Sequence, residues 1–148
     1  MKIVSKNSFK VVGILVESDW RNIHKKMREA WSVFKERVEE IKERKGDYYF
    51  DISLAMEEDL FRQLICVEVS NFNDIPVGMT GKVIPAANYI YYQHKGPVEN
   101  IAESFGKIYQ WAEENAYSTD DFKIDYGYSD DDIGEVHDLY LRVKDEKI

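Results

Sequence analysis

The clearest pattern along the chain is a stripe of apolar residues at spacings of three and four between Trp20 and Ile41, with Lys, Arg and Glu between them. Such spacing is typical of an amphipathic helix with one buried face. Asp19 is a suitable N-cap, and Gly46 ends the pattern. We expect Trp20 and Trp31, which lie on the stripe, to pack in the core. A long helix of this kind must cover another element, most simply a sheet.

Segments with the patterns of strands flank this helix. Residues 9–18 are mostly apolar and rich in β-branched side chains, which favours a central strand. Residues 48–56 alternate between apolar and polar positions, and so do residues 64–70. Residues 71–81 contain one proline and two glycines, which indicates a loop.

The same order of patterns recurs in the second half of the chain. Residues 87–94 have the pattern of a strand, and residues 99–114 carry a second helical stripe. Two further alternating segments follow at residues 122–128 and 137–143. Each half therefore has the order strand–helix–strand–strand.

These patterns predict an α+β fold in a single domain that spans residues 1–148. The duplicated strand–helix–strand–strand units, at about residues 8–72 and 80–145, form a curved antiparallel sheet with two helices on one face. The other face of the sheet then becomes concave, and we expect a ligand cleft there, between the repeats.

Charge and composition exclude several classes of partner. The net charge of −8 argues against direct nucleic-acid binding, which requires clustered Lys and Arg. No run of 18 apolar residues predicts a membrane span, and residues 1–10 lack the apolar core of a signal peptide. The single cysteine, Cys66, cannot form an intramolecular disulfide and fits a reducing interior. We therefore expect a cytoplasmic protein, and the sequence leaves its oligomeric state open.

The histidines and glycines do not form a pattern that indicates a metal or a cofactor. His24, His94 and His137 lack ligand spacing with one another and with Cys66. His94 precedes a Lys-Gly-Pro turn, and we expect a structural role for it. The glycines are isolated, so no phosphate-binding loop is predicted.

Aromatic residues make up 14% of the chain, and ten of them are tyrosine. Tyrosine makes a surface apolar and hydrogen-bonding at once, which favours a binding cavity. The alternative is a tyrosine-rich sheet that binds nothing.

Glu68 is the first candidate for the charged group of this cavity. It lies in the otherwise apolar segment ICVEV, where a charge is unexpected. If Val67 and Val69 face the helices, Glu68 faces the cleft. There it would pair with a cationic ligand or act as a general acid or base. The alternative is a glutamate on a solvated sheet face.

Other candidates follow from the alternation of the strands. Tyr91 lies on the face opposite Ile90, while Asp138 and Tyr140 point together. Cys66 shares a face with Glu68, although nothing nearby in sequence activates its thiol. The predicted ligand-binding residues are Glu68, Tyr91, Trp111, Tyr126, Tyr140, Cys66, Asp125 and Asp138.

The chain also resembles the GyrI-like small-molecule-binding family over roughly residues 8–144. The similar features are Ile-Pro-Ala at 84–86, the aromatic strand that follows, the His-Lys-Gly-Pro turn at 94–97, and Tyr109 with Trp111. In the first half, CVEVSN followed by a proline and Gly-Met is similar as well. This domain forms the effector-binding part of AraC-type and MerR-type multidrug regulators.

The resemblance implies a duplicated fold whose cleft binds hydrophobic, bulky, planar and often cationic compounds on stacked aromatic rings around a buried carboxylate. Residues 1–8 leave no room for a helix-turn-helix, so we expect a stand-alone member. Family members often carry a glutamate where Asp138 stands, which leaves open which carboxylate is the buried one.

Three hypotheses for the function remain. The first is a small-molecule-binding protein that senses or sequesters such compounds. The second is a hydrolase that opens the cyclopropane ring of electrophilic DNA-alkylating compounds, with Glu68 as its general acid or base. The third is a protein–protein inhibitor that acts through its acidic exterior, as the name of the family suggests.

Overall fold

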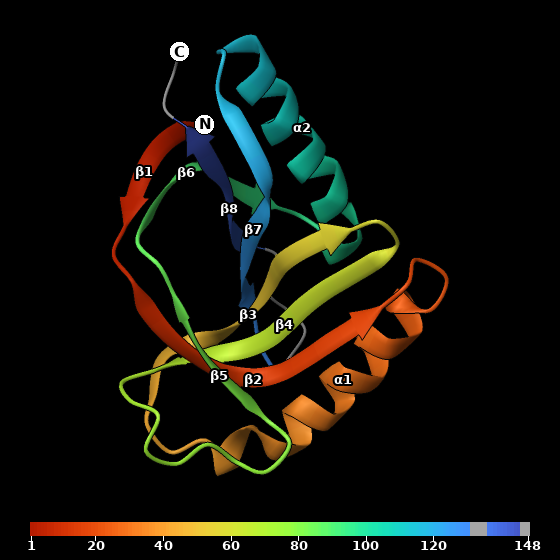
Figure 1. The fold of residues 1–148 in the computed structure, drawn as a ribbon, viewed down its shortest axis with the longest axis vertical. Coiled ribbons are helices and arrows are strands. Elements are labelled where there is room, and N and C mark those ends of the chain that lie inside the picture. Colours follow the sequence, from red (N-terminus) through yellow and green to blue (C-terminus); the bar gives the residue numbers. More distant parts are fainter. Residues whose placement is uncertain (131–135, 146–148) are drawn as a thin grey trace.

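The computed structural model describes residues 1–130 and 136–145, in which eight strands form one open antiparallel sheet (Figure 1). The strands are β1 (Lys2–Lys6), β2 (Phe9–Ser18), β3 (Arg44–Glu57), β4 (Leu60–Val69), β5 (Thr80–Ile84), β6 (Ala87–Lys95), β7 (Ser118–Tyr128) and β8 (Val136–Asp145). The helices are α1 (Ile23–Arg37), followed by the 3-10 helix η1 (Val38–Glu40), and α2 (Ile101–Glu114), preceded by the 3-10 helix η2 (Val98–Asn100). Among the described residues, no helix is long and apolar enough to cross a lipid bilayer.

The strand order reveals two similar halves that share one sheet. The order is β1-β6-β8-β7-β3-β4-β2-β5, so the unit β2-α1-β3-β4 meets the unit β6-α2-β7-β8 where β3 pairs with β7. Each half also extends the other, because β1 pairs with β6 and β5 pairs with β2. The duplicated fold predicted from the sequence is therefore confirmed, with two short edge strands, β1 and β5, that the alternation does not indicate.

Both helices lie on the same face of the sheet, one over each half (Figure 1). The stripe of α1 contributes Phe34 to a core that includes Ile65 and Val67 of β4. The stripe of α2 contributes Ile108 to a separate core with Leu139 of β8. Because each helix packs at the centre of its own half, the seam between β3 and β7 lies beneath the space between the helices.

The first helix begins later than its apolar stripe suggests. Asp19 accepts a hydrogen bond from the backbone N–H of Asn22 at 3.0 Å, in a turn that precedes the helix at Ile23. Trp20 lies in this turn and is 62% exposed, so the expectation that it packs in the core is wrong. Trp31 lies within the helix and packs against the core as a half-buried side chain.

The opposite face of the sheet is also buried over much of its area. A third core lies there, with Val11 of β2, Ile52 of β3, Ile84 of β5 and Tyr89 of β6 among its members. Residues from edge and central strands meet in one cluster because the sheet is strongly curved (Figure 1). This curvature leaves the helix face as the more open of the two at the seam.

Candidate functional site: a cavity between the two helices

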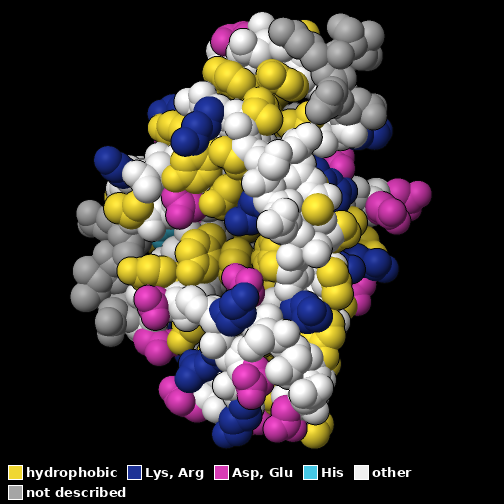
Figure 2. All heavy atoms as spheres, turned by 90° about the vertical axis from the view of Figure 1, so that its left-hand side faces the viewer, with side chains coloured by type: hydrophobic (Ala, Val, Ile, Leu, Met, Phe, Trp, Pro, Cys, Tyr) yellow, Lys and Arg dark blue, Asp and Glu magenta, His cyan; other side chains and the backbone are white. Residues whose placement is uncertain are grey.

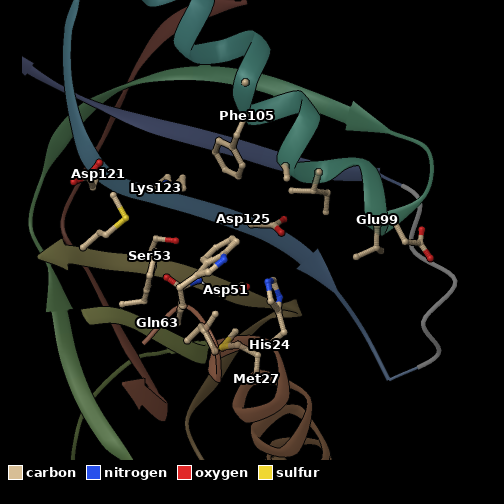
Figure 3. A pocket seen from close by; sticks show the side chains of 18 of the residues that line it. His24, Met27, Asp51, Ser53, Gln63, Glu99, Phe105, Asp121, Lys123 and Asp125 are labelled. Atoms are coloured by element: carbon tan, nitrogen blue, oxygen red, sulfur yellow. Dashed lines mark hydrogen bonds between the residues drawn. The ribbon is translucent and has the colours of Figure 1, made fainter. Parts of the chain in front are cut away.

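A cavity of about 750 Å³ lies on the helix face, above the seam between β3 and β7. Its walls are aromatic: α1 provides Trp31, α2 provides Phe105 and Tyr109, and β4 provides Phe61. Figure 3 shows the labelled Phe105 reaching in from α2, with His24 and Met27 of α1 on the other side. A volume of this size is suited to a drug-sized molecule, because such sites range over roughly 300–1,000 Å³.

The floor of the cavity carries two carboxylates in equivalent strands of the two halves. Asp51 of β3 and Asp125 of β7 are direct partners in the antiparallel ladder across the seam. Directly opposite side chains on one face have Cβ atoms about 5 Å apart, so the pairing brings the two carboxyl groups together. Both line the cavity and are labelled in Figure 3. The seam therefore concentrates negative charge beneath aromatic walls.

Asp125 is held in place by two hydrogen bonds. It is 5% exposed, its Oδ1 lies 2.7 Å from Nδ1 of His137, and its Oδ2 accepts a hydrogen bond from the Tyr128 hydroxyl at 2.6 Å. Burial and the charges of Asp125 and Asp51 raise the pKa of Tyr128 well above its ordinary value, so this hydroxyl remains a donor. The carboxylate is thus fixed in one orientation.

A bulge at Gly127 brings the Tyr128 ring to the cavity. The register of β3 and β7 shifts between Tyr49 and Phe50, opposite this glycine. Gly127 has φ +147°, and a Cβ atom there would lie 2.7 Å from the Val136 carbonyl oxygen, so only glycine fits. The bulge turns Tyr128 toward the same face as Asp125, in spite of the odd spacing between them.

Asp51 is the carboxyl group of the floor whose pKa is raised. Gln63 of β4 donates a hydrogen bond to its Oδ1 at 3.2 Å. Burial, and then the negative charge of Asp125, raise its pKa to about 7, while the positive charge of Lys123 acts in the opposite direction. Near neutral pH, Asp51 therefore exists in both the protonated and the ionised form.

Lys123 adds a positive charge to the same cavity. It lies opposite Ser53 in the ladder, two residues before Asp125. Its ammonium nitrogen donates a hydrogen bond to the Tyr109 hydroxyl at 3.3 Å and lies 5.8 Å from the ring centroid of Phe105. The lysine is therefore anchored to the wall formed by α2.

Most of the residues predicted from the sequence lie on the other face of the sheet. Asp125 lines the cavity, whereas Glu68, Tyr91, Tyr126, Tyr140 and Asp138 alternate away from the helices, as the strand pattern predicts. On that face the Tyr91 hydroxyl donates a hydrogen bond to Asp138 at 2.6 Å, and the rings of Tyr91 and Tyr140 lie 5.2 Å apart. Their role in ligand binding stays a prediction.

The remaining two predicted residues, Cys66 and Trp111, belong neither to the cavity nor to the group around Tyr91 and Asp138 on the opposite face. Cys66 is wholly buried in the core of the opposite face, where burial raises the pKa of its thiol. Trp111, near the end of α2, stacks on Tyr117 with the ring centroids 5.7 Å apart, and neither residue lines the cavity. Their roles in binding also stay predictions.

The opposite face contains a cation from the chain itself. The ammonium nitrogen of Lys6 lies 4.5 Å from the ring centroid of Tyr140 and 5.5 Å from that of Phe9. Glu68 and Asp138 attract it, although burial has the larger effect and lowers the pKa of Lys6. Figure 2 shows the left-hand side of Figure 1, where hydrophobic side chains gather at the centre with charged side chains around them.

Sequence reasoning missed Asp51 and Lys123. Asp51 lies inside the segment YFDIS, so it satisfies the criterion that selected Glu68, a carboxylate in an apolar strand. Alternation places Asp51 on the face opposite Phe50 and Ile52, and the structure turns that face toward the helices. Local alternation does not show which face of this strand meets the helices, so it could not place Asp51 beside Asp125. In the described ranges, 1–130 and 136–145, no group of three His, Cys, Asp or Glu is arranged to hold a metal ion.

Comparison with solved structures shows where this fold occurs. The protein SAV2435, solved with bound tetraphenylphosphonium, aligns with a TM-score of 0.77 and 14% identity over 97% of this chain and 93% of that one. The C-terminal domain of EcmrR aligns with a TM-score of 0.67 and 17% identity over 99% and 97% of the two chains. An integron cassette protein from Vibrio cholerae aligns with a TM-score of 0.70 and 11% identity over 97% and 95%.

At these identities the likeness shows a shared fold. A search of curated proteins found no match to the chain. The model of the Cass2 family, described as integron-associated effector binding protein, matches residues 2–143, which is nearly the whole chain. This protein therefore belongs to the Cass2 family of integron-associated effector-binding proteins, which has the GyrI-like fold.

Proposed function

We propose that this protein binds bulky, hydrophobic cations that carry planar aromatic rings, in the cavity between α1 and α2. The observation that carries the proposal is the pairing of Asp51 with Asp125 beneath aromatic walls. A cation over an aromatic face gains about 0.5–2 kcal/mol, and the carboxylates add to this attraction. The protein would act as a sensor or scavenger of such compounds.

The comparisons support this proposal without establishing the ligand. The family is described as effector-binding, and SAV2435 was solved with tetraphenylphosphonium, a lipophilic cation. The size and positive charge of tetraphenylphosphonium are compatible with a cavity of about 750 Å³ that has an acidic floor.

Isothermal titration calorimetry with tetraphenylphosphonium tests the proposal directly. We expect saturable binding to the wild-type protein. Trp31→Ala removes a wall of the cavity and should weaken binding roughly tenfold, because truncation of a buried aromatic contact in a binding site typically costs more than 1 kcal/mol. Trp111→Ala is the matched control, since Trp111 lies on the other helix and outside the cavity.

Asp51→Asn provides a second variant that preserves the shape of the cavity. At about pH 8, above the pKa of Asp51, it removes a negative charge and should weaken binding severalfold. Absence of saturable binding to the wild type, or equal loss in Trp31→Ala and Trp111→Ala, would refute binding in this cavity. Circular dichroism of each variant checks that the fold is retained.

Hydrolysis of a strained electrophile in the same cavity is a second candidate function. The observation that favours it is the pKa of about 7 of Asp51 beside Asp125, because a carboxyl group that titrates near neutral pH suits general acid–base work. In such a reaction water adds across a ring carbon–carbon bond. Its hydroxyl bonds to one carbon of the broken bond, and the electron pair of that bond takes up the proton at the other carbon or at an atom conjugated with it.

Chromatography of a cyclopropane-containing alkylating compound, incubated with the protein, tests this candidate. Enzymatic ring opening should be lost in Asp51→Asn. Glu68→Gln separately tests the catalytic role predicted for Glu68, which lies on the opposite face. Tight binding without turnover would eliminate the hydrolase and leave the binding function intact.

A further inference from the structure

The cavity contains a positive group as well as its acidic floor. Among the described residues that line it, Lys123 is the only Lys or Arg. Its side chain is half-buried and leaves the floor for the wall of α2, where the Tyr109 hydroxyl accepts its hydrogen bond. A lysine is not required to form an aromatic cavity, so its position points to a role in selecting the ligand.

The two charges of the cavity occupy different places. Lys123 and Asp125 share one face of β7 at a separation of two residues, which corresponds to about 7 Å along a strand. The ammonium group is held over the rings of Phe105 and Tyr109, whereas Asp125 is held by His137 and faces Asp51. The cavity therefore has a positive end on the side of α2 and a negative end at the seam.

The other charged groups that line the cavity do not cancel the separation between its positive end and its negative end. Asp121 lies two residues before Lys123 on the same face of β7, but its side chain is exposed at the rim, where water and salt screen its charge. Glu99 is exposed as well. His24 of α1 lies on the far wall and is exposed to solvent. The inner cavity is thus dominated by Lys123 and the pair of Asp51 and Asp125.

We infer that the cavity selects zwitterionic compounds, which carry a cationic group and a carboxylate on one aromatic framework, over simple cations of the same size. The carboxylate of the ligand accepts hydrogen bonds from the Lys123 ammonium and the Tyr109 hydroxyl, and its cationic end faces Asp51 and Asp125. A simple cation meets the same carboxylates but is repelled by Lys123. This inference rests on the proposed function and specifies its ligand class.

A matched pair of dyes tests the inference. Rhodamine B has a free carboxylate and is zwitterionic near neutral pH, whereas its ethyl ester is a cation with the same aromatic body. Fluorescence anisotropy should show that the wild type binds rhodamine B roughly tenfold more tightly than the ester, as expected for a charge-assisted hydrogen bond.

Substitution of Lys123 should move the two affinities in opposite directions. Lys123→Met should weaken rhodamine B binding roughly tenfold and strengthen binding of the ester severalfold, because a repulsive charge is removed. Lys123→Arg should preserve the preference. Lys107→Met, on the exposed side of α2, is the matched control and should change neither affinity. A variant that has lost its fold would bind both dyes more weakly, so misfolding cannot shift the two affinities in opposite directions.

The outcomes separate this inference from the function on which it rests. Equal or tighter binding of the ester by the wild type, or parallel changes of both dyes in Lys123→Met, would overturn the selection of zwitterions while binding in the cavity stands. Failure of both dyes and of tetraphenylphosphonium to bind the wild type would overturn the proposed function and the inference together.

Discussion

The two faces of the sheet carry the same kinds of side chain in different arrangements. On the face away from the helices, Lys6 lies over the ring of Tyr140 and is attracted by Glu68 and Asp138. On the helix face, aromatic rings and carboxylates surround a cavity of about 750 Å³. On both faces a lysine of the chain lies over aromatic rings near carboxylates, but on the helix face these groups line a cavity.

This difference shows that residue types do not identify a binding site. Both faces satisfy the criterion of a carboxylate among aromatic rings. What separates them is packing: the curved sheet buries one face against its own edge strands, whereas α1 and α2 lie apart over the two halves. The open space arises from the duplication of the fold.

The largest expected effect comes from removing one carboxylate on each face. Asp125→Ala should lower the free energy of unfolding by about 3 kcal/mol, because His137 and the Tyr128 hydroxyl lose a buried partner. Asp138→Ala should cost about 1 kcal/mol, since Asp138 is half-buried and accepts its bond from Tyr91. Urea denaturation followed by circular dichroism measures both. Equal losses would contradict the distinction between the two carboxylates.

The pH dependence of stability tests the raised pKa of Asp51. A carboxyl group with a pKa of about 7 in the folded protein, above its unfolded value, binds a proton more tightly when folded. Its contribution to stability is therefore complete at low pH and is lost as the pH rises from about 4 to about 7. Asp51→Asn does not have this loss. Because solvent reaches the half-buried Asp51 side chain and screens part of the effect, the variant should exceed the wild type at about pH 8 by a free energy of unfolding of about 2 kcal/mol, roughly half of the full linkage value.

Urea denaturation at several pH values gives the difference in the free energy of unfolding between the wild type and Asp51→Asn. The difference should grow with pH across this window, because Asp51 is the group removed. A constant difference would show that Asp51 titrates at its ordinary pKa. Glu68→Gln, on the opposite face, is the control. It should change the pH dependence of the free energy of unfolding less than Asp51→Asn does.

A smaller effect is expected from the lysine of the opposite face. Lys6→Met removes a cation from the ring of Tyr140, but it also removes a charge whose burial outweighs its attraction to Glu68 and Asp138, so the free energy of unfolding should change by less than about 1 kcal/mol. It should leave the affinity for tetraphenylphosphonium unchanged, because Lys6 does not line the cavity. Lys95→Met, at an exposed position on β6, is the control for stability. A changed affinity in Lys6→Met would show that the two faces are coupled.

The smallest effect is predicted for Glu68. Glu68→Gln should alter the affinity for tetraphenylphosphonium by less than about twofold, because the side chain lies on the other face and is screened by solvent. Asp51→Asn should have the larger effect in the same calorimetric titration. The reverse order would restore Glu68 as the charged group of the site and place the ligand on the opposite face.

Several elements could be predicted from the sequence because local patterns determine them. Residues 9–18 coincide with β2, and the alternation correctly assigned Val67 and Val69 to the helix side. The edge strands β1 and β5 could not be predicted in this way. Each has five residues, mostly solvent-exposed, and is defined by pairing with the other half of the chain.

The candidate site was predictable only in part. Asp125 was among the predicted residues, but it was expected in the same cleft as Glu68. The side of the sheet that holds the cavity could not be predicted, because it depends on how the two helices and eight strands of the described residues fill space. Alternation places Asp51 on the face opposite Phe50 and Ile52, but it reveals neither that this is the helix face nor which residue faces Asp51 across the seam. Trp20 illustrates the same limit, since a turn held by Asp19 moves it off the helix stripe.

By itself, the sequence determined the two helices, the central strands, which side chains of a strand share a face, and the acidic, tyrosine-rich character of the protein, because these follow from local periodicity and composition. Only the tertiary structure decided that Asp51 meets Asp125, that Gly127 turns Tyr128 toward them and that Lys123 reaches the wall of α2. Those contacts join segments that are distant in the sequence, and their register is set by the pairing of the two halves.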